Sequence, residues 1–302
     1  MITGHTTAST ARPTTAKAPT GWWLRPLDIV FAAMAAGGLV VGMWVAHGGP
    51  AAMTGAEGIA SGLGQLSALV GTYLALLGVA LMSRAPWIDH VVGSDRLARW
   101  HRWIGIGSVL LLSLHVVLTT TAWAMASGVN PVAEFVALNG TWDVLLATVG
   151  MGLLLLVAVS SMRFVRRRLE YETWYGLHLY AYLGIALAFL HEVTMGSDLI
   201  ADPIALATWV GLYLVAFGLL LGYRVVAPVL LTLRHRPRVA AVVRESADTV
   251  SIHLHGQRFE RIDARAGQFF RLRFLRDGGW WRPHPFSLSA EPDGRTLRFT
   301  VK

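Results

Sequence analysis

Six long apolar stretches, separated by short polar segments, dominate the chain from residue 27 to residue 226. Each is about 20 residues long or longer, which is the length that an α-helix needs to cross a hydrocarbon core of ~30 Å. They lack the charged face that the helices of a soluble bundle present to water. The pattern predicts an all-α membrane bundle of six transmembrane helices at Leu27–Ala46, Gly58–Met82, Trp103–Met125, Trp142–Met162, Trp174–Met195 and Pro203–Val226.

The two ends of the chain have different patterns. Residues 1–26 are rich in Thr, Ala and Pro and lack periodicity, which predicts a disordered cytoplasmic tail. After Pro237, apolar and polar residues alternate, and Asp293-Gly294 is a strong hairpin signal. The expected strands are Arg238–Arg244, Thr249–Leu254, Gln268–Phe274, Ser287–Ala290 and Thr296–Val301. The prediction is a transmembrane domain at 27–227, followed by a truncated antiparallel β-barrel at 236–302.

Composition supports a membrane protein and excludes some chemistry. The chain is 54% hydrophobic and only 15% charged, whereas soluble domains carry about 25% charged residues. Cysteine is absent, which excludes disulfides, thiolate metal sites and Fe–S clusters. Lysine occurs only at Lys17 and Lys302, although Ala and Gly are abundant. This bias is typical of a GC-rich bacterial genome and favours a bacterial plasma membrane.

The basic residues predict the orientation of the spans. They occur in the N-terminal tail, in the second-to-third and fourth-to-fifth connections, and after the sixth span. The other three connections contain no Lys or Arg. Because basic residues are retained on the cytoplasmic side, this asymmetry predicts that both termini are cytoplasmic.

Four histidines lie in or beside the third and fifth spans, which are expected to be parallel: His101, His115, His178 and His191. Their spacings of 14 residues (115 − 101) and 13 residues (191 − 178) correspond to rises of roughly 21 Å and roughly 20 Å. Each level therefore offers one imidazole from each helix, and two imidazoles can ligate one haem iron. The pattern predicts two b haems, one between His101 and His178 and one between His115 and His191.

Helical phase supports this pairing unequally. Fourteen residues at ~100° each return to within ~40° of the same face, whereas thirteen residues miss it by ~140°. The fifth span fits only if its helix is locally irregular, or if the two haems are approached from different sides. Isolated histidines bonded to backbone or to neighbouring helices are the alternative interpretation.

Two short motifs in the C-terminal part, Gly267-Gln268-Phe269 and His284-Pro285-Phe286-Ser287, join the histidine spacings in indicating a family. Over residues 27–302 the chain resembles the ferric reductase and NADPH oxidase superfamily. The resemblance implies that FAD binds the barrel, with the aromatic Phe286 against the isoalloxazine ring and Ser287 near its N5 edge. His284 replaces the arginine of soluble ferredoxin-reductase relatives, beside Pro285, and Arg282 is a candidate for a flavin phosphate.

The same resemblance implies an electron relay from cytoplasmic NAD(P)H through FAD and the two haems to an acceptor on the outer face. The chain ends at Lys302, within the expected barrel, so we expect the NAD(P)H-binding domain to be missing or supplied by another chain. No nucleic acid is expected as a partner. Two alternatives remain open: a quinol-linked di-haem cytochrome b, and a haem-free membrane transporter or scaffold.

The expected acceptor follows from the charge of the outer connections. Near the ends of the third and fifth spans these contain no basic residue, but they contain Glu134, Glu192, Asp198 and Asp202. Such a surface is predicted to attract cations, which favours ferric species over superoxide formation. His47 is expected to lie near the outer haem propionates.

Overall fold

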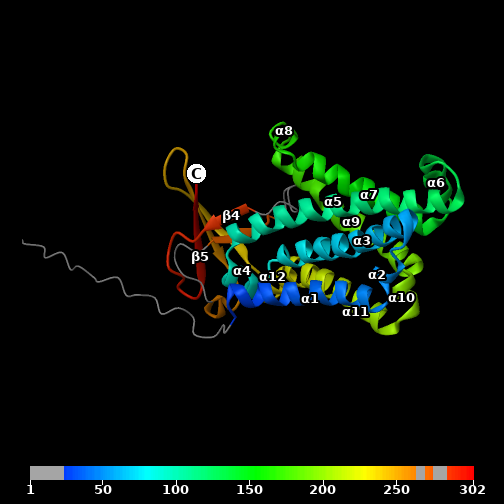
Figure 1. The fold of residues 1–302 in the computed structure, drawn as a ribbon. Coiled ribbons are helices and arrows are strands. Elements are labelled where there is room, and N and C mark those ends of the chain that lie inside the picture. Colours follow the sequence, from blue (N-terminus) through cyan, green and yellow to red (C-terminus); the bar gives the residue numbers. More distant parts are fainter. Residues whose placement is uncertain (1–23, 263–268, 275–283) are drawn as a thin grey trace, which may run out of the picture. The chain divides into compact units, whose positions relative to one another are not determined.

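The computed structural model describes residues 24–262, 269–274 and 284–302 (Figure 1). Most of the predicted N-terminal tail, the Gly267-Gln268 part of the first flavin motif and Arg282 lie outside these ranges. The chain divides into two compact units, with the boundary between Phe217 and Gly218.

All six predicted spans are helices long and apolar enough to cross a membrane. Their bounds are Pro26–Ala46 (α1), Gly55–Leu81 (α3), Ser94–Ser127 (α5), Trp142–Ser161 (α7), Tyr171–Met195 (α9) and Pro203–His235. The last of these consists of α11 (Pro203–Leu221), a π-helical turn (Gly222–Val226) and α12 (Ala227–His235). The predicted α-helical membrane bundle is confirmed.

Short helices occupy the connections of the bundle: α2 (Gly49–Ala52), α4 (Pro86–Val92), α6 (Pro131–Leu138), α8 (Arg163–Arg166) and α10 (Ser197–Ala201). Helices α2, α6 and α10 gather at one end (Figure 1). The long helix α5 ends at Gly128, whose φ of 67° is a left-handed conformation that glycine adopts without strain. Helix α6 then begins after Asn130, whose side chain accepts a hydrogen bond from the Ala133 amide.

Glycines allow two helix pairs to approach closely. An added Cβ at Gly71 of α3 would lie 3.0 Å from Leu112 of α5. In the α7–α9 pair, an added Cβ at Gly184 would lie 2.8 Å from the Gly150 carbonyl oxygen, and one at Gly150 would lie 2.5 Å from the Gly184 oxygen. Small residues at helix contacts are the usual means of close packing in lipid, where dispersion replaces the hydrophobic effect.

The C-terminal unit contains two small antiparallel sheets. One has the strand order β1 (Arg238–Arg244), β2 (Val250–His255), β5 (Thr296–Val301). The other pairs β3 (Phe269–Leu272) with β4 (His284–Ser287). A core of buried apolar side chains packs between them, formed by Leu254, Phe259, Leu288, Leu297 and Phe299.

One expected strand pairing forms only in part. The segment Ser287–Ala290 was expected to form a hairpin strand with Thr296–Val301, but β4 begins earlier, at His284, and pairs with β3. An isolated bridge from Leu288 to Phe299 and a hydrogen bond from the Ser289 amide to the Arg298 carbonyl join this segment to β5. The Ser289 hydroxyl also bonds to Arg298 and Thr300 of β5. Pro292 has no amide hydrogen to donate to a ladder, so the strand cannot continue to the turn. Over the described ranges the strands do not close into a barrel.

We predict that Gly184→Ala destabilises the bundle, because the added methyl group would meet the Gly150 carbonyl oxygen at 2.8 Å. Overpacking of this kind typically costs about 1–3 kcal/mol. Gly152→Ala is the matched control, since an added Cβ there has no described heavy atom within 4 Å. The thermal unfolding midpoint in detergent should fall for Gly184→Ala and stay level or rise for Gly152→Ala. Equal midpoints would contradict the close α7–α9 contact.

The turn before β5 yields a pH prediction. The Asp293 carboxylate accepts hydrogen bonds from the Arg295 and Thr296 amides and from the Thr296 hydroxyl, and these bonds lower its pKa to about 2. Because the folded pKa is depressed, the stabilisation is present above the ordinary aspartate pKa of ~3.9. It should be lost as the pH falls through about 2. Carboxyl-carbon NMR of labelled protein would reveal the midpoint, and titration of Asp293 near pH ~4 would contradict these bonds.

Candidate functional site

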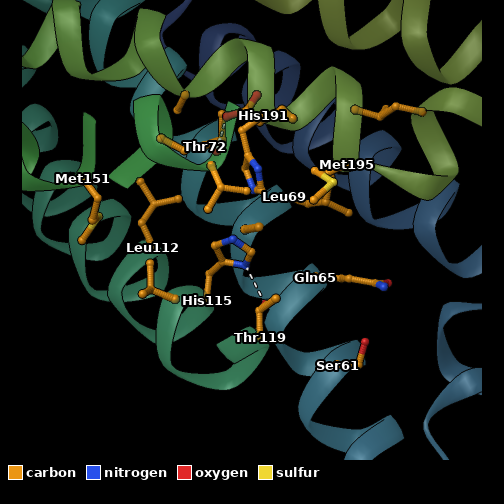
Figure 2. A pocket seen from close by; sticks show the side chains of 18 of the residues that line it. Ser61, Gln65, Leu69, Thr72, Leu112, His115, Thr119, Met151, His191 and Met195 are labelled. Carbon is orange, nitrogen blue, oxygen red and sulfur yellow. Dashed lines mark hydrogen bonds between the residues drawn. The ribbon is translucent and has the colours of Figure 1, made fainter. Parts of the chain in front are cut away.

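The four predicted histidines of α5 and α9 face one another in two pairs. The ring centroids of His101 and His178 are 5.9 Å apart, and those of His115 and His191 are 6.3 Å apart. Figure 2 shows the His115 and His191 rings pointing toward each other across the space between the two helices. The structure therefore brings all four residues together at two separate levels of the bundle.

Backbone carbonyls of α3 orient the two imidazoles of α5. His115 Nδ1 lies 3.0 Å from the Gly64 carbonyl oxygen, and His101 Nδ1 lies 3.3 Å from the Gly78 carbonyl oxygen. A carbonyl can only accept, so Nδ1 carries the hydrogen in these contacts. Nε2 then carries the lone pair that can ligate a metal.

These contacts belong to a regular ladder that the sequence analysis did not identify. Glycines recur every seven residues on α3, at 64, 71 and 78, and polar residues recur every seven on α5, at His101, Ser108 and His115. The Ser108 hydroxyl donates to the Gly71 carbonyl at 2.8 Å, midway between the two histidine contacts. The two seven-residue spacings are visible in the sequence and could have predicted the antiparallel pairing of α3 with α5.

The two imidazoles of α9 have different surroundings. His178 Nδ1 lies 3.5 Å from the Ser161 hydroxyl of α7, which also accepts a hydrogen bond from Trp174 Nε1 at 3.2 Å. The Trp174 ring lies 5.1 Å from the His178 ring. By contrast, His191 Nδ1 is buried and has no hydrogen-bond partner among the described residues.

Helix α9 is regular between its two histidines. It is α-helical throughout Tyr171–Met195, so no local break brings His191 into line with His178. The ring planes of the two pairs are inclined by 70° and 49°, respectively. Helix α9 thus presents its histidines to α5 from different sides of its own axis, which is the second of the two arrangements left open by the sequence.

A mostly apolar cavity of about 560 Å³ surrounds the His115–His191 level. Its lining includes Leu112 of α5 and Met151 of α7, while Thr72 and Gln65 of α3 supply polar atoms (Figure 2). Cofactor sites typically have volumes of roughly 300–1,000 Å³ with a few convergent polar groups. The cavity has the size and polarity of such a site.

The histidine pairs fit haem ligation. Two imidazoles that share one iron at metal–nitrogen distances of ~2 Å place their ring centroids about 6 Å apart. The observed separations of 5.9 Å and 6.3 Å agree with this value. Among the described residues, no group of three or more His, Cys, Asp or Glu side chains could hold a metal ion by itself. Two imidazoles per level would suit a macrocycle that supplies the remaining ligands.

The prediction that acidic residues are exposed at the outer end is wrong for two of them. Glu192 lies inside the bundle, where it accepts hydrogen bonds from Thr72, Trp209 and Tyr213. Glu134 is also buried, with 7% of its surface exposed. The inward phase of α9 at its last turns and the fold of α6 bury these carboxyl groups. Neither carboxyl group therefore contributes to an exposed acidic surface that could attract a cationic acceptor.

The remaining expectations for this end concern His47, Asp202 and Asp198. His47 Nε2 lies 3.2 Å from the Asp202 carboxylate, and His47 also lines the cavity of the His115–His191 level. The side chain of Asp198 lies outside the described part of the chain.

The predicted flavin residues of the C-terminal unit lie on β4 and are accessible. His284, Pro285 and Ser287 are exposed, and Phe286 is half-buried. The His284 and Phe286 rings stack with centroids 5.9 Å apart and an interplanar angle of 14°. The pairing of Phe269 with Ser287 joins the two sequence motifs in one sheet. A stacked pair with one exposed and one half-buried ring can receive a planar ring system.

Comparison with known proteins agrees with the membrane part of this description. Residues 67–189 match the family described as "Ferric reductase like transmembrane component". The match runs from α3 into α9 and contains His101, His115 and His178. A search of curated proteins found no significant match. The chain is an integral membrane protein that carries a ferric reductase-like transmembrane domain.

Proposed function

We propose that this chain is a transmembrane electron-transfer protein that holds one b haem between His101 and His178 and a second between His115 and His191. The observation that carries the proposal is the pairing of imidazole rings at two levels, with separations of 5.9 Å and 6.3 Å. The ferric reductase-like domain match supports an oxidoreductase function of this kind.

The residues of the chain have distinct tasks in this proposal. When bound, the two haems would supply one-electron carriers at the two histidine levels. His101 and His115 present Nε2 as the ligating atom, because the carbonyls of Gly78 and Gly64 accept the Nδ1 hydrogens. The apolar lining of the cavity, including Leu112 and Met151, excludes water and thereby influences the redox potential.

The C-terminal unit is proposed to bind FAD and to receive electrons from NAD(P)H. The pair of His284 and Phe286 supports this assignment, because it offers two parallel aromatic rings on β4, the strand that also carries Ser287. The basic residues of the connections support an orientation with both termini in the cytoplasm, where NAD(P)H is available.

Two alternative functions can be distinguished from the proposed one by the haem and flavin content of the purified protein. A quinol-linked di-haem cytochrome b would contain both haems but would not need the flavin motif on β4. A haem-free transporter or scaffold would have no Soret absorption band. Purified protein with two haems and a bound or titratable flavin supports the proposed function over both alternatives.

The first prediction concerns the haem ligands. Each of the variants His101→Ala, His115→Ala, His178→Ala and His191→Ala should lower the haem-to-protein ratio from about two to about one, because each iron loses an axial ligand. The pyridine haemochrome assay measures this ratio. His90→Ala is the control, because His90 is an exposed residue of α4 that bonds to the Pro86 carbonyl. Wild-type ratios in all four variants would contradict the proposal.

The second prediction concerns the flavin. Ser287→Ala should weaken FAD binding about tenfold, because a hydrogen bond contributes roughly 0.5–1.5 kcal/mol. Fluorescence titration of the purified protein with FAD measures the affinity. Ser246→Ala is a suitable control, since Ser246 is an exposed serine between β1 and β2 that bonds to Asp248. If Ser287→Ala and wild type bind FAD equally, Ser287 does not contact the flavin.

A further inference from the structure

Glu192 of α9 is a carboxyl group with partners on two other helices. Its oxygens accept hydrogen bonds from Thr72 Oγ1 of α3 at 3.2 Å and from Trp209 Nε1 of α11 at 2.8 Å. Tyr213 of α11 donates to both oxygens, at 2.8 Å and 3.0 Å. Three neutral donors thus converge on one carboxyl group that lines the cavity of the His115–His191 level.

A carboxyl group inside a membrane bundle must be stabilised by hydrogen-bond partners. Ionisable side chains within spans are costly to insert and persist where partners satisfy them. Here the partners come from α3 and α11, so the carboxyl group ties α9 to both helices. Each bond also restrains rotation of α9 about its own axis.

The neighbouring residue, His191, lacks the restraint that the α5 histidines have. His101 and His115 are held by carbonyls of α3, whereas His191 Nδ1 is buried without a hydrogen-bond partner among the described residues. The direction of the His191 ring therefore depends on the rotation of the α9 backbone. Two side chains tie this turn of α9 to other helices: Thr194 donates to Asp143 of α7 at 2.6 Å, and Glu192, which is adjacent to His191, bonds to α3 and α11.

Helical phase makes this restraint necessary. Counted from His178, position 192 returns to within ~40° of the same face, whereas position 191 misses it by ~140°. A rotation of α9 by ~100°, the angle between adjacent residues, would exchange His191 for Glu192 opposite His115. The hydrogen bonds of Glu192 hold the helix against that rotation.

We propose that Glu192 is a positioning residue for the His115–His191 level. Its hydrogen bonds to Thr72, Trp209 and Tyr213 fix the rotation of α9 so that the His191 ring faces His115. Helix α3 then orients both rings at this level. The Gly64 carbonyl contacts His115 directly, and Thr72 acts on His191 through Glu192. This inference rests on the proposed function, because it concerns the geometry of a haem-ligand pair.

The experiment removes the hydrogen bonds of Glu192 in two different ways. Glu192→Ala removes the acceptor, and the double variant Trp209→Phe with Tyr213→Phe removes two donors without altering α9. Glu170→Gln is the control, because Glu170 is an exposed carboxylate at the start of α9 that does not line this cavity. Low-temperature electron paramagnetic resonance of the oxidised proteins reports the orientation of the axial imidazoles at each haem. The variants His101→Ala and His115→Ala assign the two signals.

We expect the signal of the His115–His191 level to shift or disappear in both test variants, while the signal of the His101–His178 level stays unchanged. Glu170→Gln should match wild type at both levels, and Glu192→Gln should give a smaller shift than Glu192→Ala. Two unchanged signals in the test variants would overturn the positioning role, as would equal changes at both levels, which indicate general loss of structure. A wild-type protein without two low-spin haem signals would instead overturn the proposed function together with this inference.

Discussion

The contact between backbone carbonyls of α3 and imidazoles of α5 is the interaction on which the site depends. It requires the two helices to approach closely, and an added Cβ at Gly64 would lie 2.6 Å from the Thr119 hydroxyl. Glycine at this position therefore permits the 3.0 Å contact between Gly64 and His115. The contact places the hydrogen on Nδ1 and leaves Nε2 to face the opposing ring of α9.

The membrane setting explains why polar side chains of the bundle are paired so fully. An unsatisfied polar group inside a bilayer costs several kcal/mol, because lipid offers no hydrogen-bond partner. Ser108 therefore bonds to the Gly71 carbonyl, and Glu192 collects donors from α3 and α11. The Nδ1 atom of His191, which has no hydrogen-bond partner within the described part of the chain, departs from this pattern at the level of the proposed haem.

The spans and the paired histidines could be predicted from the sequence, because hydropathy and helical rise depend only on local residues. Strands β1 and β5 were predicted with their observed bounds, because the alternation of apolar and polar residues is also a local pattern. The environment of Glu192 could not be predicted, because its burial depends on how α11 packs against α9. The pairing of β4 with β3 was missed, because partner choice between strands is set by tertiary contacts and by the stop at Pro292. The haem and flavin assignments stay predictions.

Paired imidazole ligation at both levels is the central claim, and carbon monoxide tests it most directly. Carbon monoxide binds ferrous haem only where an axial position is open or easily vacated. We predict that the purified wild-type protein contains about two b haems per chain, with two axial imidazoles on each iron. Its dithionite-reduced absorption spectrum should not change when carbon monoxide is added. A complete shift to a carbon monoxide complex at either haem, or a content of one haem or none, would contradict the account.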